Sequence, residues 1–443
     1  MTERKSRSQS QLVELFIHVA EALGLSSDRD LAELADATVE NVPNWRSGAV
    51  QEFKAQKLKT IKTNLAEHIE RLRADRGEIE RAQDLAVVPL EVEEGSSPTD
   101  LQRQFRDSVS YDYLGHRFLY FEAMGALAWE NLIKRGYDQD RWVSATEEFA
   151  KTWLDKGPIA DALGLGKKSL KRGLDLISLG PGEGSKEVAV LGAVIEALRK
   201  GDDRLGWLTY APVDVSIPLL LEAATAARRL CLEQKGQART RLQVRSFCAD
   251  FEEGRMLFKD RLPSAQKPDL PTLRLILMLG NTFGNLREEE RFIRQRLWPL
   301  MRTGDLAWIE VGLRLHPIEN DPLYRMTMGD RGETATDANR RLLLEGPFRR
   351  FEAATGRAPT PLDVRIWLRE DDDSARVPGS INFCHDLVLR EERRTCTMLY
   401  SRRYDVEKLA RWFERLDLEV LRIQRVEDDK KRARVAHLLL RRR

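Results

Sequence analysis

Apolar residues follow two different patterns along this chain, and the change from one pattern to the other divides the chain into regions. Near the N-terminus they recur at helical spacing, as in Leu12, Leu15, Val19 and Leu23. Ser27 then provides an N-cap before a second short apolar segment. Beyond about residue 174, short apolar runs alternate with longer amphipathic segments. We therefore expect helices alone at the start of the chain and alternating strands and helices later.

The N-terminal region reads as a small all-α domain. Residues 10–48 hold three short helical segments, and residues 51–84 are highly charged and favour a helix. The composition then shifts to a stretch rich in Glu, Gly, Ser and Pro. We place a helical domain at 1–84, a linker at 85–100 and a second domain at 101–443.

The second domain is expected to begin with helices and to continue as an α/β fold. The helical part covers about 101–165, with a predicted core of Phe118, Phe121, Leu127, Trp129 and Leu132. The later segments predict strands at 174–179, 208–215, 242–247, 273–279 and 306–311, and helices at 186–198, 219–232 and 288–301. This alternation predicts a doubly wound, mostly parallel sheet. Two β-favouring runs, 418–426 and 433–440, predict a C-terminal antiparallel hairpin at the sheet edge.

Composition and charge exclude several classes of protein. The chain is 42% hydrophobic and 33% charged with a net charge of +2, so the overall charge points to neither nucleic acid nor a membrane. The four cysteines lack metal-ligand spacing, and no apolar run approaches the roughly 20 residues that cross a bilayer. We expect a cytoplasmic protein without a bound metal and without a membrane partner.

A glycine-rich turn follows the first predicted strand of the alternating region. Gly180, Gly182 and Gly184 allow the backbone to approach a ligand closely, and the next helix presents unpaired N–H groups. The turn lacks the Gly-Lys-Ser/Thr ending of a phosphate-binding loop and does not match the GxGxxG dinucleotide pattern. Taken alone, it predicts little more than a strand-to-helix connection.

Acidic residues at the ends of the next two strands narrow the interpretation. Asp214 is placed to accept hydrogen bonds from both hydroxyls of a ribose. Asp250 could accept from an adenine amino group, with Phe251 as an apolar face. Each acid singly could equally be a helix cap, but three features in order on successive strand ends favour a nucleoside site.

The loop after the fourth strand has two compatible interpretations. Asn285 suits the N-cap of a helix that starts at Leu286, with Glu288 at the third helical position. The same loop would also lie beside the reacting centre of a bound nucleoside.

Several motifs together resemble a known family. They are Tyr111-Asp112-x-x-Gly115, the turn at 180–185, Pro-Val-Asp-Val-Ser at 212–216, Asp-Phe-Glu at 250–252, Gly-x-Thr-Phe-Gly-Asn at 280–285, and Ser401-x-x-Tyr404. From about residue 105 to 443 the chain resembles the histidine-specific S-adenosylmethionine (SAM)-dependent methyltransferases. The resemblance implies the class I methyltransferase fold, SAM as cofactor, and an inserted acceptor-site region at 312–395.

The resemblance also implies roles for individual residues. Tyr111 and Asn285 would be catalytic and would bind the acceptor, together with Ser401. The implied cofactor-binding set is Gly180, Gly182, Gly184, Ser185, Asp214, Ser216, Asp250, Phe251 and Gly280. No metal is implied.

One departure from the family changes the expected substrate. Where the family has an acidic residue for the α-amino group of histidine, this chain has Leu399. Leucine cannot pair with an ammonium group, and a buried unpaired charge costs several kcal/mol. We therefore expect a peptide or protein side chain, or another small molecule, as the methyl acceptor.

Residues 10–48 also resemble the helix-turn-helix of lambda-type phage repressors. Asn41, Asn44 and Arg46 would then face DNA. Seven acidic side chains against two basic ones, Arg29 and Arg46, oppose DNA binding, and Pro43 is expected to kink the recognition helix.

We thus expect a SAM-dependent N-methyltransferase that acts on an acceptor other than free histidine. The alternative is a DNA-binding transcription regulator whose methyltransferase-like domain senses SAM or a related ligand. DNA binding through residues 10–48, protein docking through the same unit, and a homodimer are left open.

Overall fold

The computed structural model describes most of the chain. The described residues are 16–17, 20, 25, 27–47, 56–57, 59–61, 63–64, 89–108, 111–121, 123–136, 139–166, 171, 173–200, 205–233, 242–324, 343–348, 362–369, 377–389 and 394–443. The chain divides into two compact units, Met1–Ala86 and Val87–Arg443. Most of the charged segment predicted at 51–84 lies outside the described residues.

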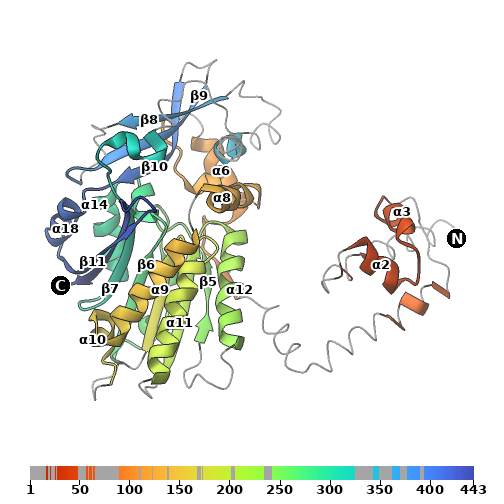
Figure 1. The fold of residues 1–443 in the computed structure, drawn as a ribbon, viewed down its shortest axis with the longest axis horizontal. Helices are drawn as coiled ribbons and strands as arrows, with labels where there is room; N and C mark the ends of the chain where they lie inside the picture. The colour runs from red at the N-terminus through yellow and green to blue at the C-terminus, as the bar shows by residue number, and fades with distance from the viewer. Residues whose placement is uncertain are drawn as a thin grey trace. The chain divides into compact units, whose positions relative to one another are not determined.

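The N-terminal unit contains three short described helices, drawn in red tones in Figure 1: α2 (Asp28–Leu34), η1 (Val39–Asn41) and α3 (Val42–Arg46). Ser27 caps α2 in a capping box with Asp30, which confirms the predicted N-cap. Pro43 lies in the first turn of α3, where a missing N–H costs no hydrogen bond, so the expected kink is wrong. Ala32, Val42 and Trp45 are buried in the core of this unit.

The second unit begins with a strand and a run of helices. These are β1 (Leu90–Val92), α6 (Pro98–Ser108), α7 (Arg117–Tyr120), α8 (Ala123–Gly136), α9 (Gln139–Asp155) and α10 (Pro158–Leu163). The predicted linker at 85–100 is therefore wrong in part, because it contains β1 and the start of α6, and β1 pairs in parallel with β5. In the predicted helical core, Phe118, Phe121 and Leu132 are buried, but Leu127 on α8 is exposed.

Strands and helices then alternate as predicted. The strands are β2 (Gly173–Leu179), β3 (Trp207–Asp214), β4 (Leu242–Val244), β5 (Ser246–Cys248), β6 (Thr272–Met278) and β7 (Leu306–Gly312). The helices are α11 (Ser185–Lys200), α12 (Ile217–Glu233), η2 (Leu257–Arg261), α13 (Pro263–Gln266), η3 (Thr282–Asn285), α14 (Glu289–Phe292), η4 (Ile293–Leu297), α15 (Trp298–Leu300) and η5 (Ile318–Asn320). The single strand predicted at 242–247 is two short ones, β4 and β5, with Arg245 between them. The helix predicted at 288–301 contains the π-helical turn η4.

The C-terminal part contributes a second sheet and completes the first. It comprises β8 (Leu362–Arg369), β9 (Ile381–Leu389), β10 (Arg394–Arg403), α18 (Val406–Glu414), β11 (Leu418–Glu427) and β12 (Ala433–Arg442). The main sheet has the order β1-β5-β3-β2-β6-β7-β12-β11, with β4 beside β3. Its strands run parallel from β1 to β7, and β12 and β11 add the predicted antiparallel hairpin. The fold class is therefore confirmed.

The central strands β2, β3, β6 and β7 are buried on both faces, as their continuous apolar sequences require. Leu174 and Leu176 of β2 point into the core under α9, α10, α11 and α12, whereas Ile177 and Leu179 point to the opposite core under α18. In Figure 1, α9 and α11 lie in front of the sheet and α18 lies at its left edge. Two helical layers thus hold the carboxyl ends of β2, β3, β5, β6 and β7 along one edge.

The small antiparallel sheet β10-β9-β8 was not predicted, and it lies at the top of Figure 1. It falls largely in the region expected to be an insertion at 312–395. Within the described residues, no helix has the length and apolarity that a membrane crossing requires.

Candidate functional site

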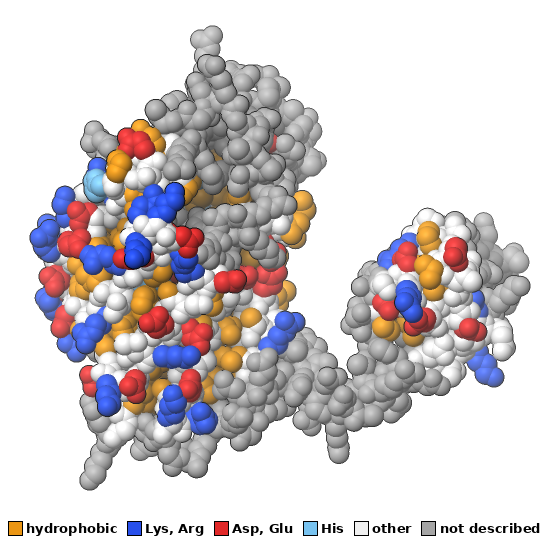
Figure 2. All heavy atoms as spheres, viewed as in Figure 1, with side chains coloured by type: hydrophobic (Ala, Val, Ile, Leu, Met, Phe, Trp, Pro, Cys, Tyr) orange, Lys and Arg blue, Asp and Glu red, His pale blue; other side chains and the backbone are white. Residues whose placement is uncertain are grey.

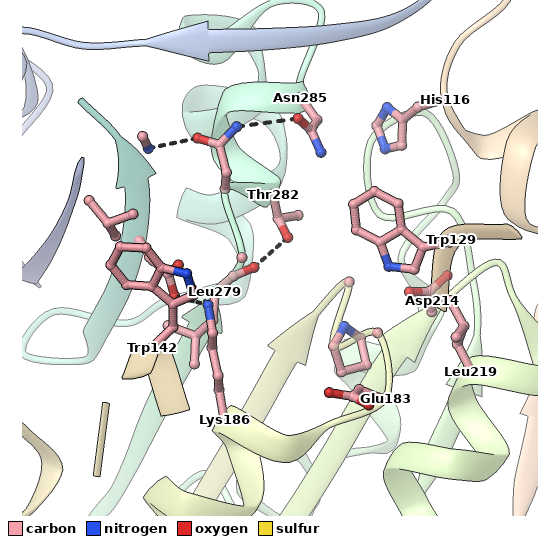
Figure 3. A pocket seen from close by; sticks show the side chains of 18 of the residues that line it. His116, Trp129, Trp142, Glu183, Lys186, Asp214, Leu219, Leu279, Thr282 and Asn285 are labelled. Carbon is pink, nitrogen blue, oxygen red and sulfur yellow. Dashed lines mark hydrogen bonds and ion pairs between the residues drawn. The ribbon is translucent and has the colours of Figure 1, made fainter. Parts of the chain in front are cut away.

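A cavity of about 370 Å³ opens along the carboxyl edge of the main sheet. It lies within the size range of small-molecule sites. Figure 3 shows its interior, with residues from several strand ends converging on one space. The lining combines the glycine turn after β2, the ends of β3 and β6, and residues from α7, α8, α9, β7, β10 and β12.

The glycine turn has the backbone conformation that only glycine adopts readily. Gly180, Gly182 and Gly184 have φ values of 68°, 58° and 84°. A Cβ on Gly184 would lie 2.8 Å from Ala223 Cα on α12, so this glycine also permits the close approach of that helix. Ser185 begins α11, and its hydroxyl donates to Glu183 Oε1 at 2.7 Å. Gly180, Gly182 and Ser185 line the cavity, whereas Gly184 faces the protein interior.

Asp214 ends β3 with one carboxylate oxygen engaged and the other available. Its Oδ1 accepts from the Ser216 backbone N–H at 2.9 Å. Its Oδ2 accepts no hydrogen bond from the part of the chain that the structure describes. Burial raises the pKa of Asp214 to about 6, against the opposing effect of the N–H bonds from Ser216 and Val215. A carboxylate with one free oxygen facing a cavity fits the hydroxyls of a ribose.

Ser216 serves this site through its backbone rather than its side chain. Its hydroxyl is buried without a partner among the described residues, and it does not line the cavity. The predicted direct contact of Ser216 with the cofactor is therefore not supported.

Asp250 makes an ion pair that the sequence did not predict. Its Oδ2 accepts from Arg117 Nη1 at 2.6 Å, while Oδ1 accepts from the backbone N–H groups of Glu252 and Glu253, each at 3.0 Å. Asp250 and Phe251 both line the cavity, so their adenine contacts stay a prediction. Arg117 was missed because it lies 133 residues away in the chain.

The loop after β6 is held in place by its own asparagines. Asn281 adopts a left-handed conformation, accepts from the Gly312 N–H at 2.8 Å, and donates toward Asn285 Oδ1 at 3.4 Å. Asn285 lines the cavity, and its predicted contact with an acceptor stays a prediction. It ends η3 and does not cap a helix, because α14 begins only at Glu289. The capping interpretation is therefore wrong. Gly280, with φ of 73°, also lines the cavity.

Two of the predicted acceptor residues lie outside the cavity. Tyr111 is 60% exposed and is not among the described residues that line it, so its predicted catalytic role is not supported by this geometry. Ser401 is buried and accepts from Arg403 Nη1 at 3.0 Å. It is Arg403 that reaches the cavity.

An aromatic wall forms the side of the cavity opposite Asn285, and the sequence did not predict it. His116 immediately precedes α7, Tyr120 ends α7 and Trp129 lies on α8. Trp142 of α9 also lines the cavity, but on another side, beside Leu279 and Lys186. In Figure 3, His116 and Trp129 face Thr282 and Asn285 across the open space. Burial lowers the pKa of His116 to about 4, so its imidazole is neutral at pH 7.

A buried carboxyl group lies close to His116. Glu252 Oε2 lies 3.5 Å from His116 Nδ1, and burial raises the pKa of Glu252 to about 8. Burial thus favours the uncharged form of both side chains.

An ion pair between a part-buried lysine and a buried glutamate lies beside the glycine turn. Lys186 Nζ donates to both carboxylate oxygens of Glu310, each at 2.7 Å. Burial opposes ionisation of Glu310, but Lys186 holds its pKa below the usual range.

The residues predicted to face DNA are partly engaged within their own unit. Arg46 Nε pairs with Asp28 Oδ1 at 3.0 Å, and the Asn41 side chain donates to Thr38 Oγ1 at 2.9 Å. Asn44 is exposed. DNA binding stays a prediction. Among the described residues, no three His, Cys, Asp or Glu side chains are grouped as metal ligands.

Comparison with known proteins gives one family match. Residues 156–306 match the sequence profile of the histidine-specific, SAM-dependent methyltransferases. This segment contains the glycine turn, Asp214, Asp250 and Asn285. A search of curated protein sequences gives no significant match.

Solved structures with related folds are methyltransferases, at low similarity. A SAM-dependent methyltransferase from Clostridium acetobutylicum is 12% identical, with 72% of this chain and 97% of that chain covered and a TM-score of 0.31. The magnesium protoporphyrin IX methyltransferase from Synechocystis is 11% identical, with 73% and 97% covered and a TM-score of 0.34. Scores this low support no inference about the acceptor.

Proposed function

We propose that this chain, a SAM-dependent methyltransferase by its family match, methylates a nitrogen atom of an acceptor other than free histidine. A nitrogen acceptor follows from the family of the matched segment, which is described as histidine-specific. The observation that carries the proposed change of substrate is the environment of Leu399.

Leu399 is 7% exposed and packs in an apolar cluster with Phe118, Met398 and Leu387. It does not line the cavity. Since the family resemblance expects an acidic residue here to pair with the α-amino group of histidine, this chain lacks that contact.

The cavity residues fit SAM. Bound SAM supplies a methyl group on a sulfonium, which leaves as a neutral thioether, so transfer requires no general acid. Gly180 and Gly182 leave room for its methionine part, and Asp214 presents a free carboxylate oxygen to its ribose. Asn285, facing the same space, is placed to orient the acceptor nitrogen.

The remaining residues act by positioning and by excluding water. Tyr120 and Trp129 give one side of the cavity an apolar wall, and Trp142 adds an apolar surface on another side. These surfaces desolvate a neutral acceptor nitrogen. The neutral state of His116 also avoids placing a second cation beside a sulfonium.

Calorimetry tests the cofactor site. We expect S-adenosylhomocysteine to bind the wild type with micromolar affinity, and Asp214→Ala to abolish binding. Asp269→Ala, an exposed aspartate outside the cavity, is the matched control and should bind normally. A wild type that binds neither SAM nor S-adenosylhomocysteine would refute the proposal.

Transfer of label from isotopic SAM tests the acceptor. We expect label to enter a component of cell extract and not free histidine. If the wild-type protein methylates free histidine efficiently, the proposed change of substrate is wrong.

A further inference from the structure

We propose that the methyl acceptor is a small molecule with an anionic group, a carboxylate or a phosphate, which binds between Arg403 and Arg434. This inference rests on the proposed function and adds the chemical class of the substrate. The observations that support it concern the residues at the end of the cavity farthest from β5.

The strand order separates this end from the proposed cofactor site. Asp250, Asp214 and Gly180 lie at the carboxyl ends of β5, β3 and β2, which are successive neighbours in the sheet. Arg434 lies on β12, three strands beyond β2, which corresponds to roughly 14 Å at a spacing of about 4.8 Å per strand. A cofactor that spans β5 to β2 leaves the region near β7 and β12 for the acceptor.

Arg403 is fixed at this end by three contacts. Its Nε donates to Asp321 Oδ2 at 3.0 Å, and its Nη1 donates to Ser401 Oγ at 3.0 Å and to the Arg402 carbonyl at 3.1 Å. Its side chain crosses the last residue of β7, because a Cβ on Gly312 would lie 2.9 Å from Arg403 Cδ. The guanidinium is therefore oriented before any ligand binds.

Arg434 is held beside Arg403, because it binds Asn320, the residue that precedes the Asp321 bound by Arg403. Its Nη1 donates to the Asn320 carbonyl at 3.0 Å, and its Nε donates to Asp428 Oδ2 at 2.9 Å. Asn320 and Asp321 are consecutive, and Val435 pairs in register with Gly312. The two guanidinium groups thus flank one point of the cavity.

Each guanidinium keeps one donor group available. Within the described part of the chain, Nη2 of Arg403 and Nη2 of Arg434 donate no hydrogen bond, and neither is a buried atom. Both residues line the cavity. Two fixed N–H donor groups that face one space suit a carboxylate or a phosphate.

The carboxylates at this end have no comparable capacity for a cationic ligand. Asp321 Oδ1 accepts from the Leu323 N–H at 2.8 Å, and its Oδ2 is taken by Arg403. Asp428 accepts five hydrogen bonds, from Lys430, Arg432 and Arg434. Both oxygens of Glu310 accept from Lys186. Both oxygens of each of these carboxylates already accept hydrogen bonds from the protein. The groups at this end that remain available to a ligand are therefore the N–H donors of the two arginines.

The test uses the whole 443-residue chain, labelled SAM and the low-molecular-mass fraction of cell extract as the acceptor source. Passage over an anion exchanger should remove the methyl-accepting activity, and the salt eluate should restore it. Arg403→Lys and Arg434→Lys should each lower labelling by about 10-fold or more while leaving the affinity for S-adenosylhomocysteine unchanged. Lysine retains a charge for Asp321 or Asp428, so these variants are expected to fold.

Arg432→Lys is the matched control. Arg432 binds the same Asp428 but does not line the cavity, so labelling should stay at the wild-type level. Accepting activity that stays in the flow-through would overturn the anion site. So would an equal loss of S-adenosylhomocysteine affinity in both variants, because the arginines would then bind the cofactor. No labelled product with any fraction would instead overturn the proposed function.

Phosphatase treatment distinguishes the two anions. Loss of accepting activity after treatment identifies a phosphate as the bound group, and its retention identifies a carboxylate. Either result supports the site, because the same pair of guanidinium groups recognises both.

Discussion

Lys186 and Glu310 form a two-point ion pair beside the glycine turn, with Lys186 Nζ 2.7 Å from each carboxylate oxygen. Lys186 lies in the first turn of α11, the helix that follows the glycine turn, and Glu310 lies on β7. The pair therefore joins the start of α11 to β7, which is the second strand from β2 in the sheet. Both residues line the cavity. The contact therefore fixes the part of the site between the proposed cofactor and acceptor regions. In Figure 3, Lys186 rises from the helix toward Leu279 and Trp142.

Removing one partner of this pair should destabilise the protein strongly. Lys186→Met leaves the buried Glu310 carboxylate without its cation, and a loss of about 3 to 5 kcal/mol in the free energy of unfolding is expected. The double variant Lys186→Met/Glu310→Gln should recover most of that loss. Urea denaturation provides the measurement. Lys151→Met, which breaks the exposed pair with Glu147, should cost less than about 1 kcal/mol. Equal effects of the two single variants would contradict this account.

His437 should make stability depend on pH in a defined window. It is fully buried, its Nδ1 accepts from Trp308 Nε1 at 3.0 Å, and burial lowers its pKa to about 4. Glu310, its partner across β7 and β12, raises this pKa, and Lys186 lowers it, but burial dominates. Between pH 6.5 and 4 the unfolded chain binds a proton at this residue that the folded chain does not. Stability from this group is therefore lost as pH falls through that window.

The variant His437→Gln isolates the effect. As pH falls from 7 to 4, the wild type should lose about 3 kcal/mol more unfolding free energy than the variant loses. Loss of the Trp308 contact adds an offset that does not change with pH. A difference that stays constant over this range would show that His437 does not control the pH dependence.

The parts of the fold that were predicted correctly depend on local pattern. All residues of the glycine turn lie within the continuous segment 180–184, so the sequence alone identifies it. The preceding strand β2 is buried on both faces, and its sequence is therefore a continuous apolar run. The parts that failed depend on tertiary partners. β1 has only three residues, and it is a strand because it pairs with β5, about 150 residues later.

The candidate site shows the same division. Asp214 could be found because it ends a predicted strand. Arg403 and Arg434 could not, because nothing in their local sequence distinguishes them from the many surface arginines nearby. Their position becomes evident only when β10 and β12 bring both to the loop that contains Asp321. Tyr111 shows the converse, since a motif match alone placed it at the acceptor although its side chain is exposed.

The close approach of the glycine turn to α12 can be tested with a pair of alanine substitutions. Gly184→Ala combines a positive φ with a Cβ 2.8 Å from Ala223 Cα, and we expect a loss of about 3 kcal/mol or more together with weaker S-adenosylhomocysteine binding. Gly166→Ala has a similar φ of 66°, but its Cβ would meet nothing within 4 Å. It should cost roughly 1 to 2 kcal/mol and leave binding unchanged. If thermal and urea unfolding gave equal losses for both variants, close packing against α12 would not be the cause.

Replacing Leu399 by glutamate tests whether this residue faces the acceptor or the core. Its side chain packs with Phe118 and Met398, so a carboxylate there would be buried among apolar atoms. Leu399→Glu should destabilise the protein by several kcal/mol and should not create methylation of free histidine. Leu399→Met, which preserves volume and apolarity, should cost less than about 1.5 kcal/mol. Unfolding curves and a histidine methylation assay on the same preparations give both readouts. A glutamate variant that is stable and methylates histidine would place residue 399 at the acceptor, and the proposed substrate class would then depend on this one side chain.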